Sequence, residues 1–358
     1  MKNLTVAGRL IITALILAGV YFGFRALGGN DWLKKTFPKK TEQATESPSM
    51  PSTSGSSAEE TSSASSESSD NSNSSESSDN PSQATRSTTS KAFDYQAPAP
   101  TNGKLKGVVE LGASGFNSFI VRVDKQKVWK LEKKDFDNSL VLENMATEED
   151  IRSGLKKYIG GMLDFGVGGR DIHFVVSSGA QKAEGTQKIV KALKTLNYYV
   201  NTVTPDLEAK LGLRSALPKD YADNAFVVDI GSGNTKIAWK EGNRTETLET
   251  YGAKYFQENK DDATVYDEVK AKVKQISAAN RKTCFIIGGV PYELAKEVRK
   301  GEERFTVLSA PSAYKLKNAK SKAGLNIYKA IADGTGCDQF VFDWDANFTI
   351  GFLLDLPQ

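Results

Sequence analysis

Two short stretches of the chain combine a carboxylate, glycines and polar side chains in a way that suits phosphate chemistry. In one of them an apolar strand ends at Asp229, and a polar, glycine-rich turn at 231–235 leads to Lys236 and a returning strand. Glycines let backbone N–H groups approach an anion closely, and consecutive N–H groups in a tight turn form an anion-binding hollow. The carboxylate at the strand end could hold a metal ion or its water. The turn is not a P-loop, because no Gly-Lys-Ser/Thr sequence opens a helix after it, and many such hairpins only turn the chain.

The pattern around Asp229 also occurs earlier in the chain, around Glu110. There too an apolar strand, an acid, a glycine-rich polar turn and a returning strand follow one another, over residues 107–123. A repeat of this kind indicates an internal duplication. We therefore expect two lobes, residues 104–222 and 223–358, each beginning with a hairpin whose turn can face the other.

Strands and helices alternate after each hairpin, which is typical of a layered α/β lobe. In the first lobe the apolar spacing and the capping residues predict a helix at 147–163, a strand at 172–177, a helix at 183–196 and a short strand at 198–203. In the second lobe they predict helices at 265–278, 292–300 and 313–332, a strand at 283–287 and a final strand-like segment at 349–354.

The composition argues against several classes of protein. The chain has 358 residues and a formal net charge of +3, with no basic stretch interleaved with aromatic residues, so nothing indicates nucleic-acid binding. Two cysteines, Cys284 and Cys337, and one histidine, His173, are too few for a disulfide framework or a Cys/His zinc site. His173 lies in an apolar run that predicts a buried strand, so we interpret it as structural rather than catalytic.

The N-terminal part predicts a membrane anchor followed by a linker. Residues 10–24 are uncharged and mostly apolar, and Arg9 and Arg25 on either side can extend the span by reaching into the interface. No clean small-x-small cleavage site follows, so we interpret residues 1–28 as an uncleaved transmembrane anchor rather than a signal peptide. The more basic downstream flank predicts a cytoplasmic location for the rest of the chain, although the opposite topology stays open. Residues 29–103, rich in Ser and Glu, predict a disordered linker.

Six motifs, in the same order, resemble those of the exopolyphosphatase / guanosine pentaphosphate phosphatase family, a branch of the actin–hexokinase–Hsp70 ATPase fold. They are the two hairpin turns after Glu110 and Asp229, the segments 177–183, 205–212 and 251–256, and the Gly288-Gly289 turn, and they run over nearly the whole folded region. The resemblance implies an α/β, two-lobed actin-like ATPase (ribonuclease H-like) fold, preceded by the transmembrane helix and the disordered linker.

The resemblance also implies a site and a mechanism. Two opposed phosphate loops would hold a polyphosphate or nucleotide ligand in a cleft between the lobes, with Mg²⁺ as cofactor and a glutamate activating water for attack on the terminal phosphoryl group. It implies Glu208 as the catalytic base, Glu110 and Asp229 as metal ligands, and Gly288 and Gly289 as neighbours of a nucleotide. The phosphate-binding residues that it implies are Gly112, Ser114, Asn117, Ser118, Gly231, Ser232, Gly233, Asn234, Thr235 and Lys236.

Several positions depart from the family pattern and keep the function open, among them Ala113 and Gly115, which remove hydroxyl groups from the first loop. Glu110 replaces an aspartate, Lys236 replaces a glutamate, and Gln181 and Tyr255 replace arginines that would clamp anions. One hypothesis is a membrane-anchored phosphoanhydride hydrolase acting on polyphosphate or a guanosine polyphosphate. The alternatives, which leave open whether the chain is an enzyme, are a non-catalytic nucleotide or phosphate sensor and a scaffold that contacts a protein partner or a second copy of the chain. Lys236 is the residue that most clearly separates a hydrolase from a binding protein.

Overall fold

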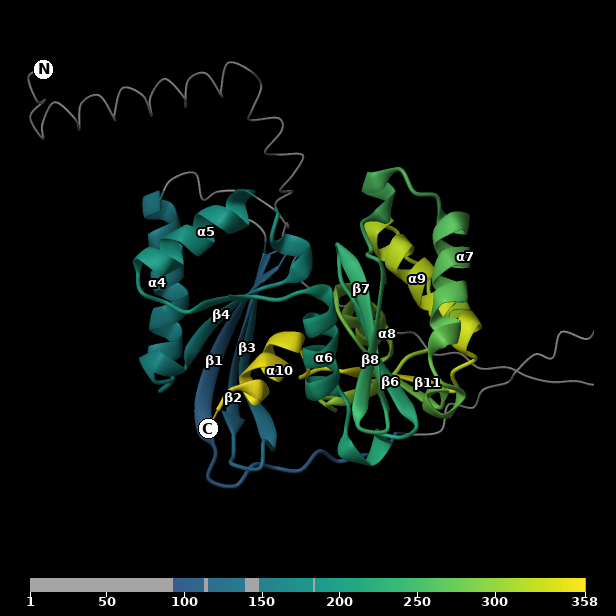
Figure 1. Ribbon diagram of the computed structural model, residues 1–358, viewed down its shortest axis with the longest axis horizontal. Helices are drawn as coiled ribbons and strands as arrows, with labels where there is room; N and C mark the ends of the chain where they lie inside the picture. The colour runs from purple at the N-terminus through teal and green to yellow at the C-terminus, as the bar shows by residue number, and fades with distance from the viewer. Residues whose placement is uncertain (1–92, 113–114, 139–147, 183, 358) are drawn as a thin grey trace, which may run out of the picture. The chain divides into compact units, whose positions relative to one another are not determined.

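The computed structural model describes residues 93–357 except 113–114, 139–147 and 183. The predicted transmembrane anchor, residues 29–92 of the predicted linker and Ser114 lie outside these residues. Residues 93–103 lie inside them, and the Phe93 ring packs against that of Phe285 with 5.7 Å between the centres, so the predicted disorder is wrong for this end of the linker. None of the helices described is both long and apolar enough to cross a membrane. Within the described part, two α/β lobes stand side by side, each built on its own sheet (Figure 1).

The first sheet grows from the first predicted hairpin. Its strand order is β3-β2-β1-β4-β5, in which β1 to β3 are antiparallel while β4 and β5 run parallel to β1. The strands are β1 Lys104–Gly112, β2 Gly115–Val123, β3 Trp129–Asn138, β4 Ile172–Val176 and β5 Val200–Thr202. Helices α4 (Glu148–Asp164) and α5 (Glu184–Thr195) cover one face, where Leu155 and Leu193 pack on Leu111 and Phe174.

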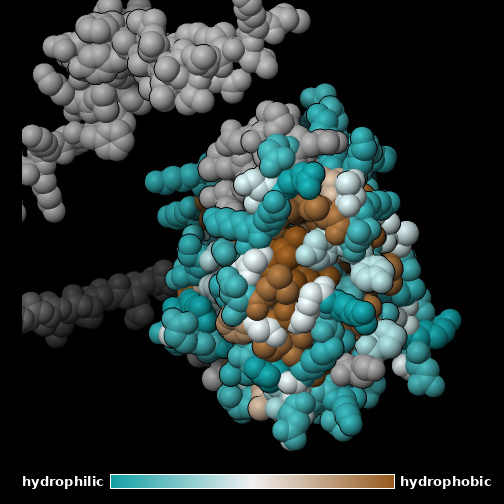
Figure 2. All heavy atoms as spheres, turned by 90° about the vertical axis from the view of Figure 1, so that its left-hand side faces the viewer, coloured by the Kyte–Doolittle hydropathy of each residue, from teal (hydrophilic) through white to brown (hydrophobic). Residues whose placement is uncertain are grey.

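The outer side of the first lobe is not uniformly polar. Figure 2 shows hydrophobic side chains in the middle of this side of the molecule, surrounded by hydrophilic ones. Several large hydrophobic residues of the first lobe stay exposed, among them Leu163, Phe165 and Tyr199. Isolated exposed apolar side chains are common on folded proteins, so they do not by themselves indicate a binding surface.

The second sheet grows from the second predicted hairpin and has the strand order β10-β11-β9-β6-β7-β8. The strands are β6 Ala225–Ile230, β7 Asn234–Glu241, β8 Arg244–Tyr251, β9 Thr283–Ile287, β10 Phe305–Val307 and β11 Gln339–Asp343. Helices α7 (Asp262–Lys272), α8 (Gly289–Val298) and α9 (Ala319–Thr335) cover one face. Apolar residues of these helices, such as Val269 and Ile327, bury the sheet residues Val228 and Ile286 there. On the other face Ala209 and Leu213 of α6 (Pro205–Ala216) pack on Val227 and Phe285.

Helices α6 and α10 (Phe348–Asp355) lie where the two lobes meet. Although α10 follows the second sheet in the chain, its Phe348 and Ile350 join the core that Val108 of β1 and Leu211 of α6 also form. The two helices approach so closely that a Cβ on Gly351 would lie 1.9 Å from the Leu211 carbonyl oxygen. This contact fixes α6, and therefore Glu208, relative to both hairpins.

The segment 349–354, which the sequence pattern predicts to be strand-like, is a helix, so that prediction is wrong. The side chain of Asn347 caps α10 by accepting a hydrogen bond from the Thr349 N–H at 2.8 Å. Most of the helix is buried between α6 and the first sheet, so its residues are apolar on nearly every side and show no helical period. A short apolar run of this kind cannot be assigned to strand or helix from periodicity alone.

The helix predicted at 313–332 in the second lobe is confirmed only from residue 319 onward. Helix α9 begins after Asn318, whose side chain accepts from the Ser321 N–H at 2.7 Å, and the residues just before it are extended or in a short 3₁₀ turn. The helix predicted at 265–278 likewise ends as an α-helix at Lys272 and continues as 3₁₀ turns. Both differences concern helix ends, where local capping decides the boundary.

Candidate functional site

The strand ends of the first hairpin, the turn of the second hairpin, the start of α6 and the start of α8 line one cavity of about 350 Å³. Most of the predicted site residues line it. These are Glu110, Gly112, Asn117, Glu208, Asp229, Gly231, Ser232, Gly233, Asn234, Lys236, Gly288 and Gly289. The structure therefore brings residues from both halves of the chain together in one cleft.

Two predicted phosphate-binding residues, Ser118 and Thr235, do not line this cavity. Both lie in strands, β2 and β7, between neighbours that do line it, and successive side chains of a strand point to opposite faces. Thr235 is fully buried, and its Oγ1 has no hydrogen-bond partner. Side-chain alternation thus leaves Asn117, Asn234 and Lys236 at the cleft and turns the two hydroxyl residues away from it.

Lys236 forms a buried ion pair with Glu208 at the bottom of the cleft. Its Nζ lies 2.6 Å from Glu208 Oε1 and 3.8 Å from Asp229 Oδ2, and the Lys236 and Glu208 side chains are only 5% and 1% exposed. Asp229 stands directly opposite Lys236 in the β6–β7 hairpin, while α6 brings Glu208 from the other side. The second oxygen of Glu208 accepts the Ser178 N–H at 2.8 Å. Both oxygens of the predicted base are therefore engaged.

The other carboxylates of the cleft bind protons more strongly than usual. Burial raises the pKa of Glu110 to about 7, although the hydrogen bond from Asn117 lowers it. The charges of Asp229 and Glu208 add to the rise. Glu110 Oε2 accepts from Asn117 Nδ2 at 2.8 Å and from Asn347 Nδ2 at 3.1 Å. Burial also raises the pKa of Asp229, although the Lys236 charge opposes this.

The pKa of Lys236 is raised in spite of burial. Burial by itself would lower it, but the charges of Asp229, Glu208 and Glu110 and the hydrogen bond to Glu208 outweigh that effect. Lys236 is therefore an ammonium ion at neutral pH. It partly neutralises three acids that would otherwise repel one another and any anionic ligand.

The predicted Mg²⁺ site can be tested against this donor set. Within the described ranges, no group of three or more His, Cys, Asp or Glu side chains is placed to hold a metal ion. The position at which a cation would contact both Glu208 and Asp229 is taken by the Lys236 Nζ. The arrangement fits a protonated amine rather than a divalent ion, which needs several oxygen ligands around it.

The glycines of the second lobe allow close backbone packing around the turn 231–234. A Cβ on Gly252 would lie 2.3 Å from the Gly233 carbonyl carbon, and one on Gly288 would lie 2.4 Å from the Ile230 carbonyl oxygen. Gly288 also has a φ of +109°, which favours glycine. It precedes α8, whose N-terminus carries no side-chain cap and opens toward the cavity. Helix N-termini of this kind attract anions, so this edge of the cavity can attract a phosphate group, while the role of Gly288 and Gly289 as neighbours of a nucleotide stays a prediction.

Five aromatic rings form one wall of the cavity, and the sequence patterns do not predict them as site residues. They are Phe119, Phe136, Tyr292, Phe342 and Trp344. Phe119 and Phe136 come from β2 and β3 of the first lobe, and the others come from α8, from β11 and from the residue after β11. Only folding brings these three parts of the chain together, and strands β3 and β11 were themselves not predicted.

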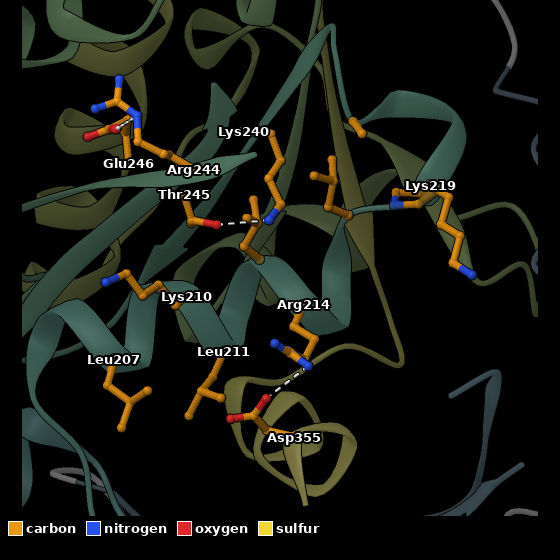
Figure 3. A pocket seen from close by; sticks show the side chains of 14 residues that line it. Leu207, Lys210, Leu211, Arg214, Lys219, Lys240, Arg244, Thr245, Glu246 and Asp355 are labelled. Atoms are coloured by element: carbon orange, nitrogen blue, oxygen red, sulfur yellow. Dashed lines mark hydrogen bonds and ion pairs between the residues drawn. The ribbon is translucent and has the colours of Figure 1, made fainter. Parts of the chain in front are cut away.

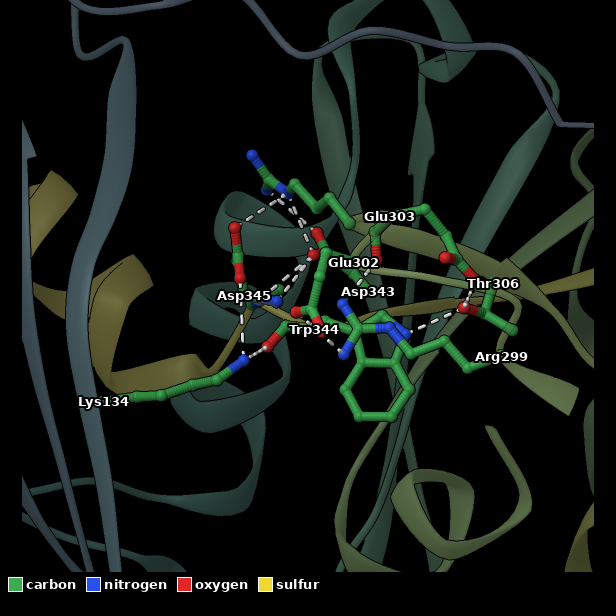
Figure 4. A network of polar contacts seen from close by, with 10 residues as sticks. Lys134, Arg299, Glu302, Glu303, Thr306, Asp343, Trp344 and Asp345 are labelled. Atoms are coloured by element: carbon green, nitrogen blue, oxygen red, sulfur yellow. Dashed lines mark hydrogen bonds and ion pairs between the residues drawn. The ribbon is translucent and has the colours of Figure 1, made fainter. Parts of the chain in front are cut away.

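A polar network next to this wall holds the two lobes together (Figure 4). Lys134 of β3 donates to the Trp344 carbonyl oxygen at 2.9 Å and lies 3.8 Å from Asp345. Arg304 binds Asp343 through two hydrogen bonds of 3.0 and 2.9 Å. The guanidinium of Arg299 lies 3.9 Å from the centre of the Trp344 ring. The network fixes Trp344 at the mouth of the cleft and joins it to the first lobe.

A larger hollow, of about 680 Å³, lies elsewhere, beside α6 and strands β7 and β8 (Figure 3). Several basic side chains surround it, but polar neighbours already hold most of them. Arg214 pairs with Asp355 at 2.8 Å, Arg244 lies 3.6 Å from Glu246, and Lys240 donates to Thr245 at 2.9 Å. We therefore place the functional site in the smaller cleft, where buried charges and glycine-rich turns converge.

Comparison with known proteins agrees with the fold. No family model and no curated protein matches the chain. Among solved structures, the Aquifex aeolicus member of the Ppx/GppA family superimposes with a TM-score of 0.53 and 15% identity, over 70% of this chain and 96% of that one. An exopolyphosphatase from Cytophaga hutchinsonii gives a TM-score of 0.55 and 15% identity, over 70% and 98% of the two chains. This chain has the fold of the Ppx/GppA exopolyphosphatases.

At this identity the likeness shows the fold alone. The solved structures therefore support the resemblance that the sequence motifs indicate, and the low identity is that of a divergent chain. Activity has to be argued from the residues in the cleft, because one fold can carry unrelated functions.

Proposed function

We propose that the cleft binds a phosphate-bearing ligand, a nucleotide or a polyphosphate, without hydrolysing it. The observation that carries this proposal is the buried ion pair between Lys236 and Glu208. A glutamate that activates water needs a free oxygen within hydrogen-bond reach of that water. Here one oxygen of Glu208 contacts an ammonium group and the other contacts the Ser178 N–H.

Three features support binding of an anion at the same place. The turn 231–234 and the N-terminus of α8, which has no side-chain cap, both line the cavity, and backbone N–H groups of glycine-rich turns and helix N-termini attract anions. Lys320 also lines the cavity, where burial and the nearby charge of Lys254 lower its pKa. The negative charge of an anion beside Lys320 would oppose both effects. Lys236, for its part, reduces the negative charge of the cleft carboxylates.

The second candidate function is hydrolysis of a phosphoanhydride bond in the bound ligand, with Glu110 instead of Glu208 as the base. Glu110 lines the cavity, and both hydrogen bonds that the structure gives it end on Oε2. Its pKa of about 7 suits proton transfer at neutral pH. In this version the Lys236–Glu208 pair would only hold the cleft floor together.

One experiment separates the two candidates. The full-length protein is titrated calorimetrically with ATP, GTP and inorganic tripolyphosphate, with Mg²⁺ or with EDTA, and phosphate release is measured in the same samples. We expect at least one ligand to bind with little dependence on Mg²⁺ and without release. Release that is lost in Glu110→Gln but kept in Glu208→Gln would favour the second candidate, and absence of any binding would refute both.

We further propose that the N-terminal anchor keeps this cleft at the cytoplasmic side of a membrane. The charge difference across residues 10–24 supports the orientation. Protease protection of a C-terminal epitope in sealed vesicles of known orientation tests it. Exposure of the epitope on the outside of cells would contradict it.

A further inference from the structure

We infer that the cleft has a subsite for a planar aromatic ring, a nucleobase, formed by Phe136 and Tyr292 from opposite lobes. The inference rests on the proposed function, because it names which phosphate-bearing ligand the cleft takes: a nucleoside polyphosphate rather than a bare phosphate chain. Aromatic side chains bind nucleobases by stacking, with little dependence on which base is present.

The rings of the aromatic wall contact one another across the boundary between the lobes. The centre of the Phe136 ring lies 6.0 Å from that of Phe119 in its own lobe and 6.0 Å from that of Tyr292 in the other. Tyr292 continues the row to Trp344 at 5.3 Å. These are ordinary distances for packed aromatic rings, so the wall is continuous from one lobe to the other.

Phe136 is the member of this wall that core packing does not explain. Phe119, Phe342 and Trp344 are each less than 10% exposed, whereas Phe136 is 49% exposed. A phenylalanine whose ring lines a cavity and is half open to solvent leaves apolar surface that a ligand can cover. Lys134, two residues away on the same face of β3, contacts Trp344 and Asp345 and so keeps this part of β3 against the second lobe (Figure 4).

The phosphate edge and the aromatic wall are correctly spaced for one ligand. Gly289 and Tyr292 both line the cavity and lie three residues apart on α8, which places them on the same side of the helix about one turn apart. A ligand with its phosphates at the N-terminus of α8 would therefore have its ribose pass along this turn and its base reach Tyr292 and Phe136. The cavity volume of about 350 Å³ is within the usual range for small-molecule sites.

The test compares ligands with and without a base on the full-length protein. ATP, GTP and inorganic tripolyphosphate are titrated into wild type, Phe136→Ala and Phe136→Tyr. We expect the nucleotides to bind wild type more tightly than tripolyphosphate. In Phe136→Ala nucleotide affinity should fall about fivefold or more while tripolyphosphate affinity stays the same, and Phe136→Tyr should keep nucleotide affinity, because tyrosine preserves the ring. Tyr199→Ala is the matched control, since Tyr199 is an exposed aromatic residue of the first lobe that does not line the cavity.

A second measurement does not depend on any cavity variant remaining folded. Trp344 is part of the wall, so a stacked base should quench tryptophan emission in wild type, and tripolyphosphate should not; Trp344→Phe assigns the signal. The inference is overturned if tripolyphosphate binds as tightly as the nucleotides, or if Phe136→Ala weakens all three ligands equally. If none of the three ligands binds wild type, the proposed function fails, and the inference fails with it.

Discussion

Replacing Lys236 with methionine removes the ammonium group that the cleft carboxylates face, with little change in side-chain length. Glu208 would keep the Ser178 N–H on one oxygen but lose its partner at 2.6 Å on the other, at a position that is almost fully buried. Breaking a buried ion pair by removing one partner costs about 3–5 kcal/mol. We expect the free energy of unfolding of Lys236→Met to fall by about that amount at pH 8, measured by urea denaturation of the full-length protein.

The loss of unfolding free energy in Lys236→Met should depend on pH. Burial raises the folded-state pKa values of Glu110 and Asp229 above their unfolded values, and without Lys236 its charge no longer opposes the rise at Asp229. Groups whose folded pKa is raised contribute stability at low pH and lose it as the pH rises through the folded pKa. The difference between wild type and Lys236→Met should therefore be largest above about pH 8 and should shrink as the pH falls below about 7.

A double variant provides the control. In Lys236→Met/Glu208→Gln the buried charge is gone together with its partner, while the glutamine carbonyl oxygen can still accept the Ser178 N–H. We expect the double variant to regain most of the stability that the single variant loses, to within about 1–2 kcal/mol of wild type. The reasoning is refuted if Lys236→Met alone costs less than about 1 kcal/mol, or if the two substitutions are simply additive.

Three further outcomes follow from the same geometry. Burial raises the pKa of Glu110 from 4.5 to about 7, so up to about 3 kcal/mol of stability present at pH 4.5 should be lost by pH 8, and Glu110→Gln should flatten this slope in urea midpoints measured against pH. Lys236→Glu adds a carboxylate where the ammonium now lies, so Mn²⁺ should raise the melting temperature of this variant by a few degrees and leave that of Lys236→Met unchanged. Gly252→Ala places a Cβ 2.3 Å from the Gly233 carbonyl carbon, so it should cost about 1–3 kcal/mol and weaken ligand binding by calorimetry, whereas Gly160→Ala, with no atom within 4 Å of the new Cβ, should leave binding unchanged.

The two hairpins could be predicted from the sequence because their signals are local. Apolar alternation, an acid and a glycine-rich turn describe β1–β2 and β6–β7 without any knowledge of tertiary contacts. The strand at 283–287 was predicted with the bounds that the structure gives β9, since its residues after Thr283 are apolar and a Gly-Gly pair follows it. The register of the β6–β7 hairpin also places Asp229 opposite Lys236 on the neighbouring strand. These local features account for most of the architecture of the sheets.

What could not be predicted depends on contacts between distant segments. Helix α10 is apolar on nearly every side because α6 and the first sheet surround it, so its sequence carries no helical period. The aromatic wall joins β3, α8 and the end of β11, and no local pattern connects Phe136 with Trp344. Glu208 was identified through the family resemblance, but its pairing with Lys236 depends on where α6 is held by α10.

The charge at position 236 affects how the cleft can hold a ligand. A divalent cation among Glu110, Glu208 and Asp229 would offset more of their negative charge than Lys236 does, because the ammonium group of Lys236 carries a single charge. Affinity for a phosphate-bearing ligand must then come from other parts of the cleft. The parts available there are the N-terminus of α8, Lys320 and the aromatic wall. A bare polyphosphate can use only the first two of these, and a nucleotide can use all three. Under the proposed function, the lysine that occupies one oxygen of Glu208 therefore also favours a ligand that carries a base.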